Sequence, residues 1–189
     1  AGIVTANYVY GKLLGNSDSV RNTSVGTNAG DAFSGTDAVD NTLIGYDAGT
    51  EITTGDANVA VGRGSLDANT TGSDNTAVGT YALTVNTTAS YNTAIGRAAL
   101  RLNETGASNT ALGYKALDAN TTASYNTAIG RNALTANTTG ASNTGVGYQA
   151  LDANTTGDYN VAFGDNSLTA NTTADNNSAF GYRALAANT

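Results

Sequence analysis

The polar and apolar residues of this chain recur with a fixed 17-residue period. A motif with the consensus Asn-Thr-Ala-apolar-Gly begins at Asn58 and returns at this interval as far as Asn177. Looser copies begin at Asn22 and Asn41, with a 19-residue interval between them. The full unit reads N-T-A-φ-G-x-x-A-L-x-A-N-T-T-G-x-x, in which φ is a large apolar residue. Such a strict period predicts one structural unit repeated along the chain.

Equivalent residues of successive units form rows, and four rows keep either one residue type or large apolar residues throughout 58–189. The first asparagine row contains Asn58, Asn75, Asn92, Asn109, Asn126, Asn143, Asn160 and Asn177. The strand apolar row contains Val61, Val78, Ile95, Leu112, Ile129, Val146, Phe163 and Phe180. The glycine row contains Gly62, Gly79, Gly96, Gly113, Gly130, Gly147, Gly164 and Gly181. The leucine row contains Leu66, Leu83, Leu100, Leu117, Leu134, Leu151, Leu168 and Leu185.

Each unit predicts a short β-strand followed by turns. A 17-residue unit is too short for a helical hairpin repeat, and Asn, Thr and Gly are poor helix formers. In the stretch 92–96, Thr93 and Ile95 share one face of a strand and Ala94 lies on the other. The Asn-Thr-Thr-Gly segment fits a turn, because Asn and Gly adopt left-handed backbone conformations readily.

The fold class that follows is all-β: a parallel β-solenoid (β-roll or β-helix) of about ten 17-residue coils. Successive coils of a solenoid lie ~4.8 Å apart, so equivalent residues stack directly over one another. We expect the strand apolar row and the leucine row to form a narrow shared core. The first asparagine row, and a second one from Asn69 to Asn188, should form ladders of side-chain amides.

The small residues of the unit suggest that several chains associate. One or two large apolar residues per coil fill little volume. A flat face rich in Ala and Gly is therefore best explained as an interface between chains. Three chains packed around an axis would share a core, so we expect a homotrimer, intertwined or packed side by side.

The motif resembles repeats of known fibrous proteins. Asn92 to Gly96 and its copies resemble the N-S-V-A-I-G motif of trimeric autotransporter adhesin heads, which are three-chain parallel β-rolls. The whole unit resembles more closely the repeats of phage tail-fibre proteins and bacterial surface fibre proteins, closely over 58–189 and loosely over 22–57. The resemblance implies an extracellular fibre, at a cell surface or on a virion. The unit is longer than the usual adhesin-head repeat.

The repeat divides the chain into three parts. Residues 1–21 precede the repeats and contain a strand-forming cluster, so we expect a cap or a subunit-joining segment. Residues 22–57 contain degenerate transition repeats, and 58–189 contain the regular ones. No cap follows the last repeat, which suggests either a fragment or a head-to-tail polymer in which the next subunit covers that end.

Composition excludes several classes of function. The chain has no Cys and no His, so it offers no thiolate nucleophile, imidazole base or zinc site. Its 8 basic residues are dispersed within a net charge of −7, which argues against a nucleic-acid partner. No apolar run is long enough for membrane insertion. Few large apolar residues would suggest disorder, but the strict period argues against it. We expect no enzyme activity, cofactor or metal.

Three surface patterns have alternative interpretations. Asp67, Asp118 and Asp152 recur in one row, but surface solubility explains them better than calcium binding, because no calcium-solenoid motif is present. Thr70-Thr71 and its copies form ranks that could bind ice, although a turn is rarely flat.

Aromatic residues form the third pattern. Arg97, Tyr114, Arg131 and Tyr148 share one row, flanked by Arg63 and Tyr182, which would allow cation–π contacts between coils. Tyr91, Tyr125 and Tyr159 form another row two coils apart, which either contacts glycans or packs within or between chains; we favour packing.

The sequence thus predicts a structural fibre or filament: a rigid repeat shaft with an adhesive or attachment role. Its expected partners are copies of itself and a cell-surface receptor or glycan. The alternatives are a receptor-binding segment of a phage tail fibre and an ice-binding β-solenoid.

Overall fold

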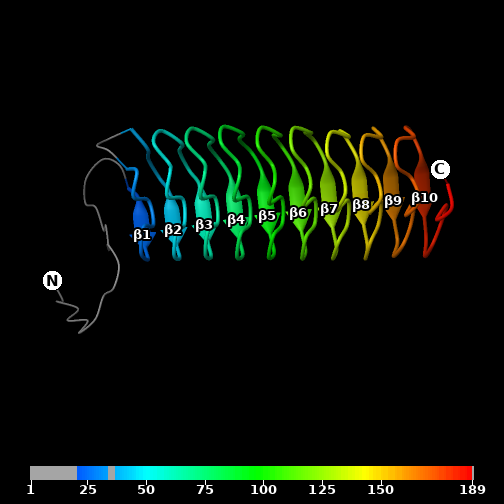
Figure 1. Cartoon of the computed structure of the whole chain (residues 1–189), viewed down its shortest axis with the longest axis horizontal. Coiled ribbons are helices and arrows are strands. Elements are labelled where there is room, and N and C mark those ends of the chain that lie inside the picture. The colour runs from blue at the N-terminus through cyan, green and yellow to red at the C-terminus, as the bar shows by residue number, and fades with distance from the viewer. Residues whose placement is uncertain (1–20, 34–36, 189) are drawn as a thin grey trace.

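The computed structural model describes residues 21–33 and 37–188. These residues form a regular stack of coils, each with one short strand on the same side (Figure 1). The strands are β1 (Thr23–Val25), β2 (Thr42–Ile44), β3 (Val59–Val61), β4 (Thr76–Val78), β5 (Thr93–Ile95), β6 (Thr110–Leu112), β7 (Thr127–Ile129), β8 (Thr144–Val146), β9 (Val161–Phe163) and β10 (Ser178–Phe180). The segment expected to form the N-terminal cap, apart from Arg21, lies outside the described residues.

The ten strands form one parallel sheet in sequence order, so the chain is an all-β parallel solenoid of about nine turns. Every pair is in register, as in the pairing of Thr93 with Thr110 and of Ile95 with Leu112. Each strand contacts only the strands before and after it in the sequence. Over the described residues there is no helix, and hence none that could span a membrane.

The 19-residue interval between the first two copies does not disturb this register. Thr23 pairs with Thr42 as later strands pair across one 17-residue unit. The backbone N–H of Asn41 also donates to Oδ1 of Asn22, the same bond that joins later coils. The two extra residues are therefore accommodated outside the strand and the asparagine row.

The interior of each coil contains small strand residues packed against leucine. The middle residue of each strand points inward and, in most coils, is an alanine that is fully buried: Ala60, Ala77, Ala94, Ala111, Ala128 and Ala162. The leucine row is also fully buried from Leu66 to Leu168, and only Leu185, in the last coil, is exposed. Leu134 lies against the strand position of Gly145, 3.4 Å from where a Cβ would be.

The strand apolar row is not part of this core, which corrects the expectation from the sequence. Its side chains lie on the outer face of the sheet. Ile95, Leu112, Ile129, Phe163 and Phe180 are exposed, and Val61, Val78 and Val146 are half-buried. A strand has two faces, and a coil of this length leaves room for only one large apolar side chain inside it. Leucine from the opposite wall fills that room, so the strand contributes alanine. Because the strand alanines are buried inside the coil, they do not form the exposed flat face that was expected to contact other chains.

Two asparagine ladders run through the interior: the first from Asn22 to Asn177, and the second from Asn69 to Asn171. In the first row, each backbone N–H donates to the side-chain oxygen of the asparagine one coil earlier, as Asn109 does to Asn92 at 3.0 Å. In the second row, the side-chain amides from Asn86 to Asn171 donate to the preceding side-chain oxygen, as Asn120 does to Asn103 at 2.7 Å. Asn188 instead donates to Asn177 of the first row. Asn109 and Asn120 also both donate to the carbonyl of Ala123. Each corner is therefore held by two buried amides, which satisfies polar groups that the narrow core would otherwise leave unpaired.

The coils of β1 and β2 have a different interior, because Gly30 and Gly49 occupy the position of the leucine row. In the coil of β2, Leu43 replaces the strand alanine. A Cβ on Gly49 would meet the side chains of Leu43 and Ile52 at 2.8 Å. Leu43 and Ile52 thus fill from two sides the volume that one leucine fills in later coils. The core volume is conserved, although different positions of the unit supply the side chains that fill it.

Candidate binding surfaces

The outer face of the sheet carries a long uncharged stripe. It combines the strand apolar row with the first residue of each strand, which is a threonine in seven strands, including Thr93, Thr110 and Thr127. None of the residues in the ten described strands is charged. In the last two coils the stripe becomes aromatic, because the rings of Phe163 and Phe180 stack with their centroids 5.9 Å apart. Because exposed apolar residues that adjoin one another often belong to interaction surfaces, this stripe is a candidate binding surface.

One long side of the sheet carries the arginine–tyrosine row. Arg131 lies between two tyrosines, with its guanidinium carbon 5.9 Å from the ring centre of Tyr114 and 5.7 Å from that of Tyr148. Arg97 also lies over Tyr114, at 5.7 Å. Arg63 lies between Tyr46 and Tyr81. The cations and rings expected to alternate between coils are therefore in contact, and these tyrosines have partners within the chain.

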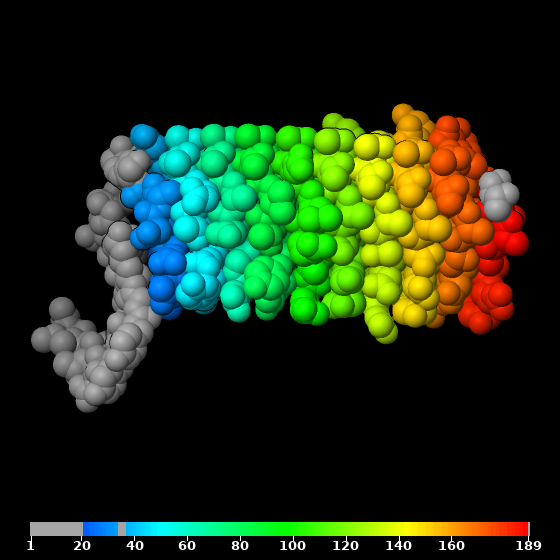
Figure 2. Space-filling view, in the orientation of Figure 1, coloured from blue at the N-terminus to red at the C-terminus, as the bar shows by residue number. Residues whose placement is uncertain are grey.

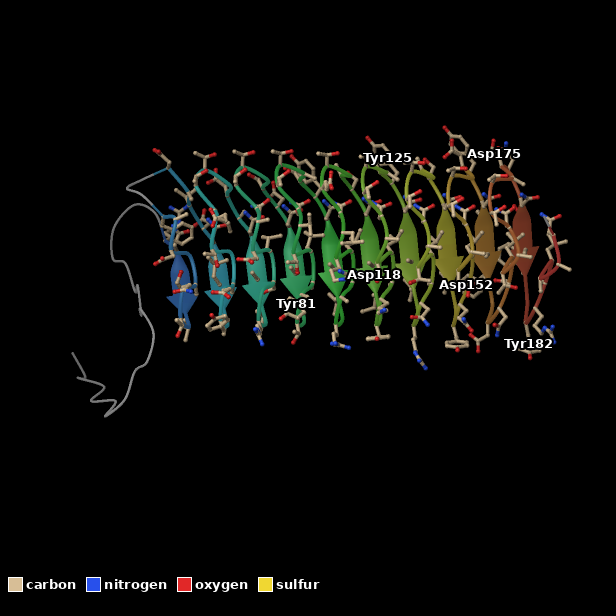
Figure 3. The ribbon with its side chains drawn as sticks, viewed as in Figure 1. Tyr81, Asp118, Tyr125, Asp152, Asp175 and Tyr182 are labelled. Carbon is tan, nitrogen blue, oxygen red and sulfur yellow. The ribbon has the colours of Figure 1, made fainter. Side chains whose placement is uncertain are left out.

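The opposite side of the sheet carries the tyrosine row. Tyr91, Tyr125 and Tyr159 are 66%, 68% and 62% exposed. Figure 3 shows Tyr125 projecting at the upper end of its coil, whereas Tyr81 and Tyr182 lie at the lower end. Among the described residues, none of these three rings contacts a cation or another ring, and none of their hydroxyls forms a hydrogen bond. Tyr182, in the last coil, is also exposed and without such a contact, but among the unpartnered rings of the described residues only these three recur at a regular two-coil spacing.

The aspartates that could suggest calcium binding do not come together. Over residues 21–33 and 37–188, no three acidic side chains form a group that could hold a metal ion. Asp118 instead accepts from Nε of Arg101 at 2.8 Å and lies 3.9 Å from the ammonium of Lys115. Asp152 forms no ion pair with any described residue; burial raises its pKa, and a hydrogen bond from Gln149 opposes that rise. Asp67 is half-buried.

The threonine pairs at the corners have divided roles. The first hydroxyl of a pair donates to the carbonyl of the next coil, as Thr70 does to Thr87 and Thr138 to Thr155, each at 3.0 Å. The second threonine, such as Thr71 or Thr139, is exposed. The pair does not present two free hydroxyls. The strand threonines of the outer face were missed as a row from the sequence, although they recur with the same period.

The surface is continuous over the coils from β1 to β10, and the face seen in Figure 2 has no deep hollow. Comparisons with protein-family models, with curated protein sequences and with solved structures found no match for this chain.

Proposed function

We propose that this chain is the rigid repeat shaft of an extracellular fibre or filament and that it serves in attachment. The observation that carries the proposal is the parallel, in-register stack of ten strands, with one asparagine ladder from Asn22 to Asn177 and a second from Asn69 to Asn171. Each coil is fixed to the next by backbone bonds, by buried amides and by packed leucines. A rod built in this way resists bending, because bending would stretch hydrogen bonds on one side of every coil.

Self-association is the second part of the proposal. The uncharged stripe is exposed in a chain that already has its own core, so the stripe is available for contact with another copy. The resemblance to three-chain fibres makes a homotrimer the expected state. In such a trimer the contact is made by the strand apolar row, including Leu112 and Ile129, rather than by alanines.

The test combines shape and mass. Electron micrographs of the purified chain should show straight rods, and light scattering at micromolar concentration should give the mass of three chains. Replacing both Leu112 and Ile129 by Asp should shift the protein to monomer. The matched control replaces Thr122 and Thr139 by Asp; these exposed residues lie at the corner of the same two coils. A monomeric wild type would contradict the association, and flexible particles would contradict the shaft.

A receptor-binding role, as in a tail fibre, is compatible with the same shaft. Ice binding is favoured by a separate observation: the strand threonines and the strand apolar row form two parallel ranks on a regular sheet. Rigid ranks with one repeat distance can order water in a fixed lattice. Thermal hysteresis at micromolar protein that disappears in Thr110→Lys would support ice binding, whereas its absence in the wild type would exclude it.

A further inference from the structure

We propose that Tyr91, Tyr125 and Tyr159 form a binding row for a neutral, extended polysaccharide, in which each ring stacks on a sugar of the same strand of polymer. The proposal adds a binding activity to the structural role and does not depend on how many chains associate. Tyr125 lies at the opposite end of its coil from the end at which Tyr182, a member of the arginine–tyrosine row, lies in its own coil (Figure 3).

The first argument is that these rings have no structural role within the described chain. On the other side of the sheet, Tyr114 lies between Arg97 and Arg131 and is 36% exposed. Tyr148 lies against Arg131 and is 39% exposed, and of the described tyrosines of that row only Tyr182, in the last coil, lacks such a contact. Tyr91, Tyr125 and Tyr159 are almost twice as exposed. A tyrosine ring has an apolar face and a polar tip, which suits it to the apolar face and hydroxyl rim of a sugar.

The second argument is the backbone at this row. All three tyrosines have left-handed backbones, with φ of 64°, 64° and 57°. The corner imposes this conformation on every coil, and it is met by Asp74, Ser108, Ser142 and Asn176 elsewhere in the row. A bulky aromatic residue is unfavourable there, whereas Asn and Asp are suited to it. The leucine row has the same left-handed backbone, but its side chains from Leu66 to Leu168 fill the core, whereas these three rings are exposed. Packing within the chain therefore does not account for tyrosine at this position, which points to a function outside the fold.

The third argument is that the row is rigid. Each tyrosine N–H donates to a carbonyl of the preceding coil, as Tyr125 does to Ala107 at 3.2 Å. The residue before each tyrosine also bonds to that coil, as Ser124 Oγ accepts from the N–H of Ala107 at 3.0 Å. Two bonds per coil fix the backbone that carries each ring, so ligand binding orders only the side-chain rotamers of the tyrosines.

The spacing and the charge define the ligand. The tyrosines are two coils apart, and the coils between them carry the short side chains of Ser108 and Ser142. Two coils span ~9.6 Å, close to the repeat of an extended β-1,4-linked polymer, in which every second sugar presents the same face. The two rows of this corner contain Asp56, Asp74, Asp158 and Asp175, but no Lys or Arg over residues 56–188. Polyanions such as nucleic acid or acidic glycans are therefore disfavoured.

Binding is measured by co-sedimentation with microcrystalline cellulose and with chitin powder, and by calorimetry with the soluble hexasaccharides of each. We expect the wild type to bind at least one of these and to leave starch granules and alginate unbound. Tyr91→Ser, Tyr125→Ser and Tyr159→Ser combined should weaken binding about tenfold or more, because three linked contacts are lost. Serine already occupies this position in two coils, so the fold is expected to persist, which circular dichroism verifies.

Two further variants separate spacing from composition. The pair Tyr125→Ser and Ser142→Tyr keeps three tyrosines but breaks the two-coil spacing, and it should bind about as weakly as Tyr125→Ser alone. Replacing Tyr114 and Tyr148 by Thr, which stands at that position in another coil as Thr80, should leave binding unchanged. The proposal is overturned if the wild type binds neither cellulose, nor chitin, nor either hexasaccharide. It is also overturned if the triple serine variant or the re-spaced variant binds like the wild type. If the wild type binds no glycan and the triple serine variant has a different oligomeric mass from the wild type, the tyrosine row instead contacts other chains.

Discussion

Gly145 and Gly147 lie at the centre and just beyond the end of β8, and their missing side chains point to opposite environments. A Cβ on Gly145 would face the core, 3.4 Å from the side chain of Leu134 and 3.1 Å from the carbonyl of Ala150. A Cβ on Gly147 would lie 2.6 Å from the carbonyl of Gly164 in the next coil, and Gly147 has a φ of +134°. Gly145 occupies a position that is alanine in most coils, whereas Gly147 is required because two coils approach each other closely there.

The same substitution at these two glycines should therefore have opposite effects. Gly145→Ala restores the residue that seven other coils have at this position, and it should raise the free energy of unfolding by up to about 1 kcal/mol. Gly147→Ala should lower it by about 2 kcal/mol or more, because the backbone conformation is restricted to glycine and the methyl group clashes. Chemical denaturation of both variants gives the comparison. Equal effects would show that the glycine row is not held by the neighbouring coil.

Two leucines of one coil test which face of the strand is inside. Leu117 is fully buried, whereas Leu112 is 44% exposed on the outer face. Leu117→Ala should lower the free energy of unfolding by about 2–5 kcal/mol, since it leaves a cavity. Leu112→Ala should change the stability of a dissociated chain by less than about 1 kcal/mol, and weaken self-association instead. Denaturation measured in dilute solution, with light scattering in parallel, distinguishes these effects. A large loss at Leu112 in the monomer would contradict the assignment of faces.

The first asparagine row should be sensitive to a single break. In Asn109→Ala the buried N–H of Asn126 loses its acceptor, because Oδ1 of Asn109 receives that bond at 2.9 Å. The carbonyl of Ala123 keeps its bond from Asn120. One unsatisfied buried donor costs about 1–3 kcal/mol, so thermal unfolding should begin at a lower temperature. Thr122→Ala, at an exposed corner residue of the same coil, is the control and should stay within about 0.5 kcal/mol of the wild type.

Asp152 should make the free energy of unfolding depend on pH. Burial raises its pKa in the folded chain above the unfolded value, so the folded state binds the proton more tightly. The free energy of unfolding should therefore fall as the pH rises from about 4, the ordinary pKa of Asp, through the higher folded value. The measurement is thermal unfolding across this range. Asp152→Asn should remove this contribution to the pH dependence.

An ion pair like that of Arg101 and Asp118 can be introduced at Asp152. Asp118 is paired with Arg101, which lies one coil earlier, and the equivalent neighbour of Asp152 is Thr135. Thr135→Arg should favour the charged form of Asp152 and add about 0.2–1 kcal/mol near neutral pH. The reciprocal change, Arg101→Thr, should remove a similar amount. Added salt should reduce both effects, and a gain in Thr135→Arg that is unchanged by salt would contradict an electrostatic origin.

The period alone was sufficient to predict the solenoid, its parallel pairing and the stacking of equivalent residues. The 17-residue spacing of Asn109 and Asn126 leaves no other regular arrangement for such short strands. The alternation of Thr93, Ala94 and Ile95 also predicted correctly that Thr93 and Ile95 share a face. This alternation does not show which face of the strand is inside, because it separates the residues into two faces without telling which of them is buried.

A signal for the correct face was nevertheless present in the sequence. The strand apolar row varies from Val146 to Phe163 in adjacent coils, a change in volume that a close-packed interior does not absorb. The middle strand residue becomes large only at Leu43, in a coil where Gly49 replaces leucine. Compensating volumes of this kind mark the packed side. The tyrosine row was visible in the sequence, but its exposure and its lack of partners required the positions of neighbouring coils.

The restriction of contacts to neighbouring coils has a consequence for how such a chain can change its length. Insertion or removal of one 17-residue unit moves the rest of the rod along its axis by one coil and recreates every contact at the junction. A change of any other size must be accommodated outside the strands, as the 19-residue interval is. Recombination between units of the gene can therefore alter the length of the rod in equal steps, and in each product every internal coil still has a neighbour on both sides.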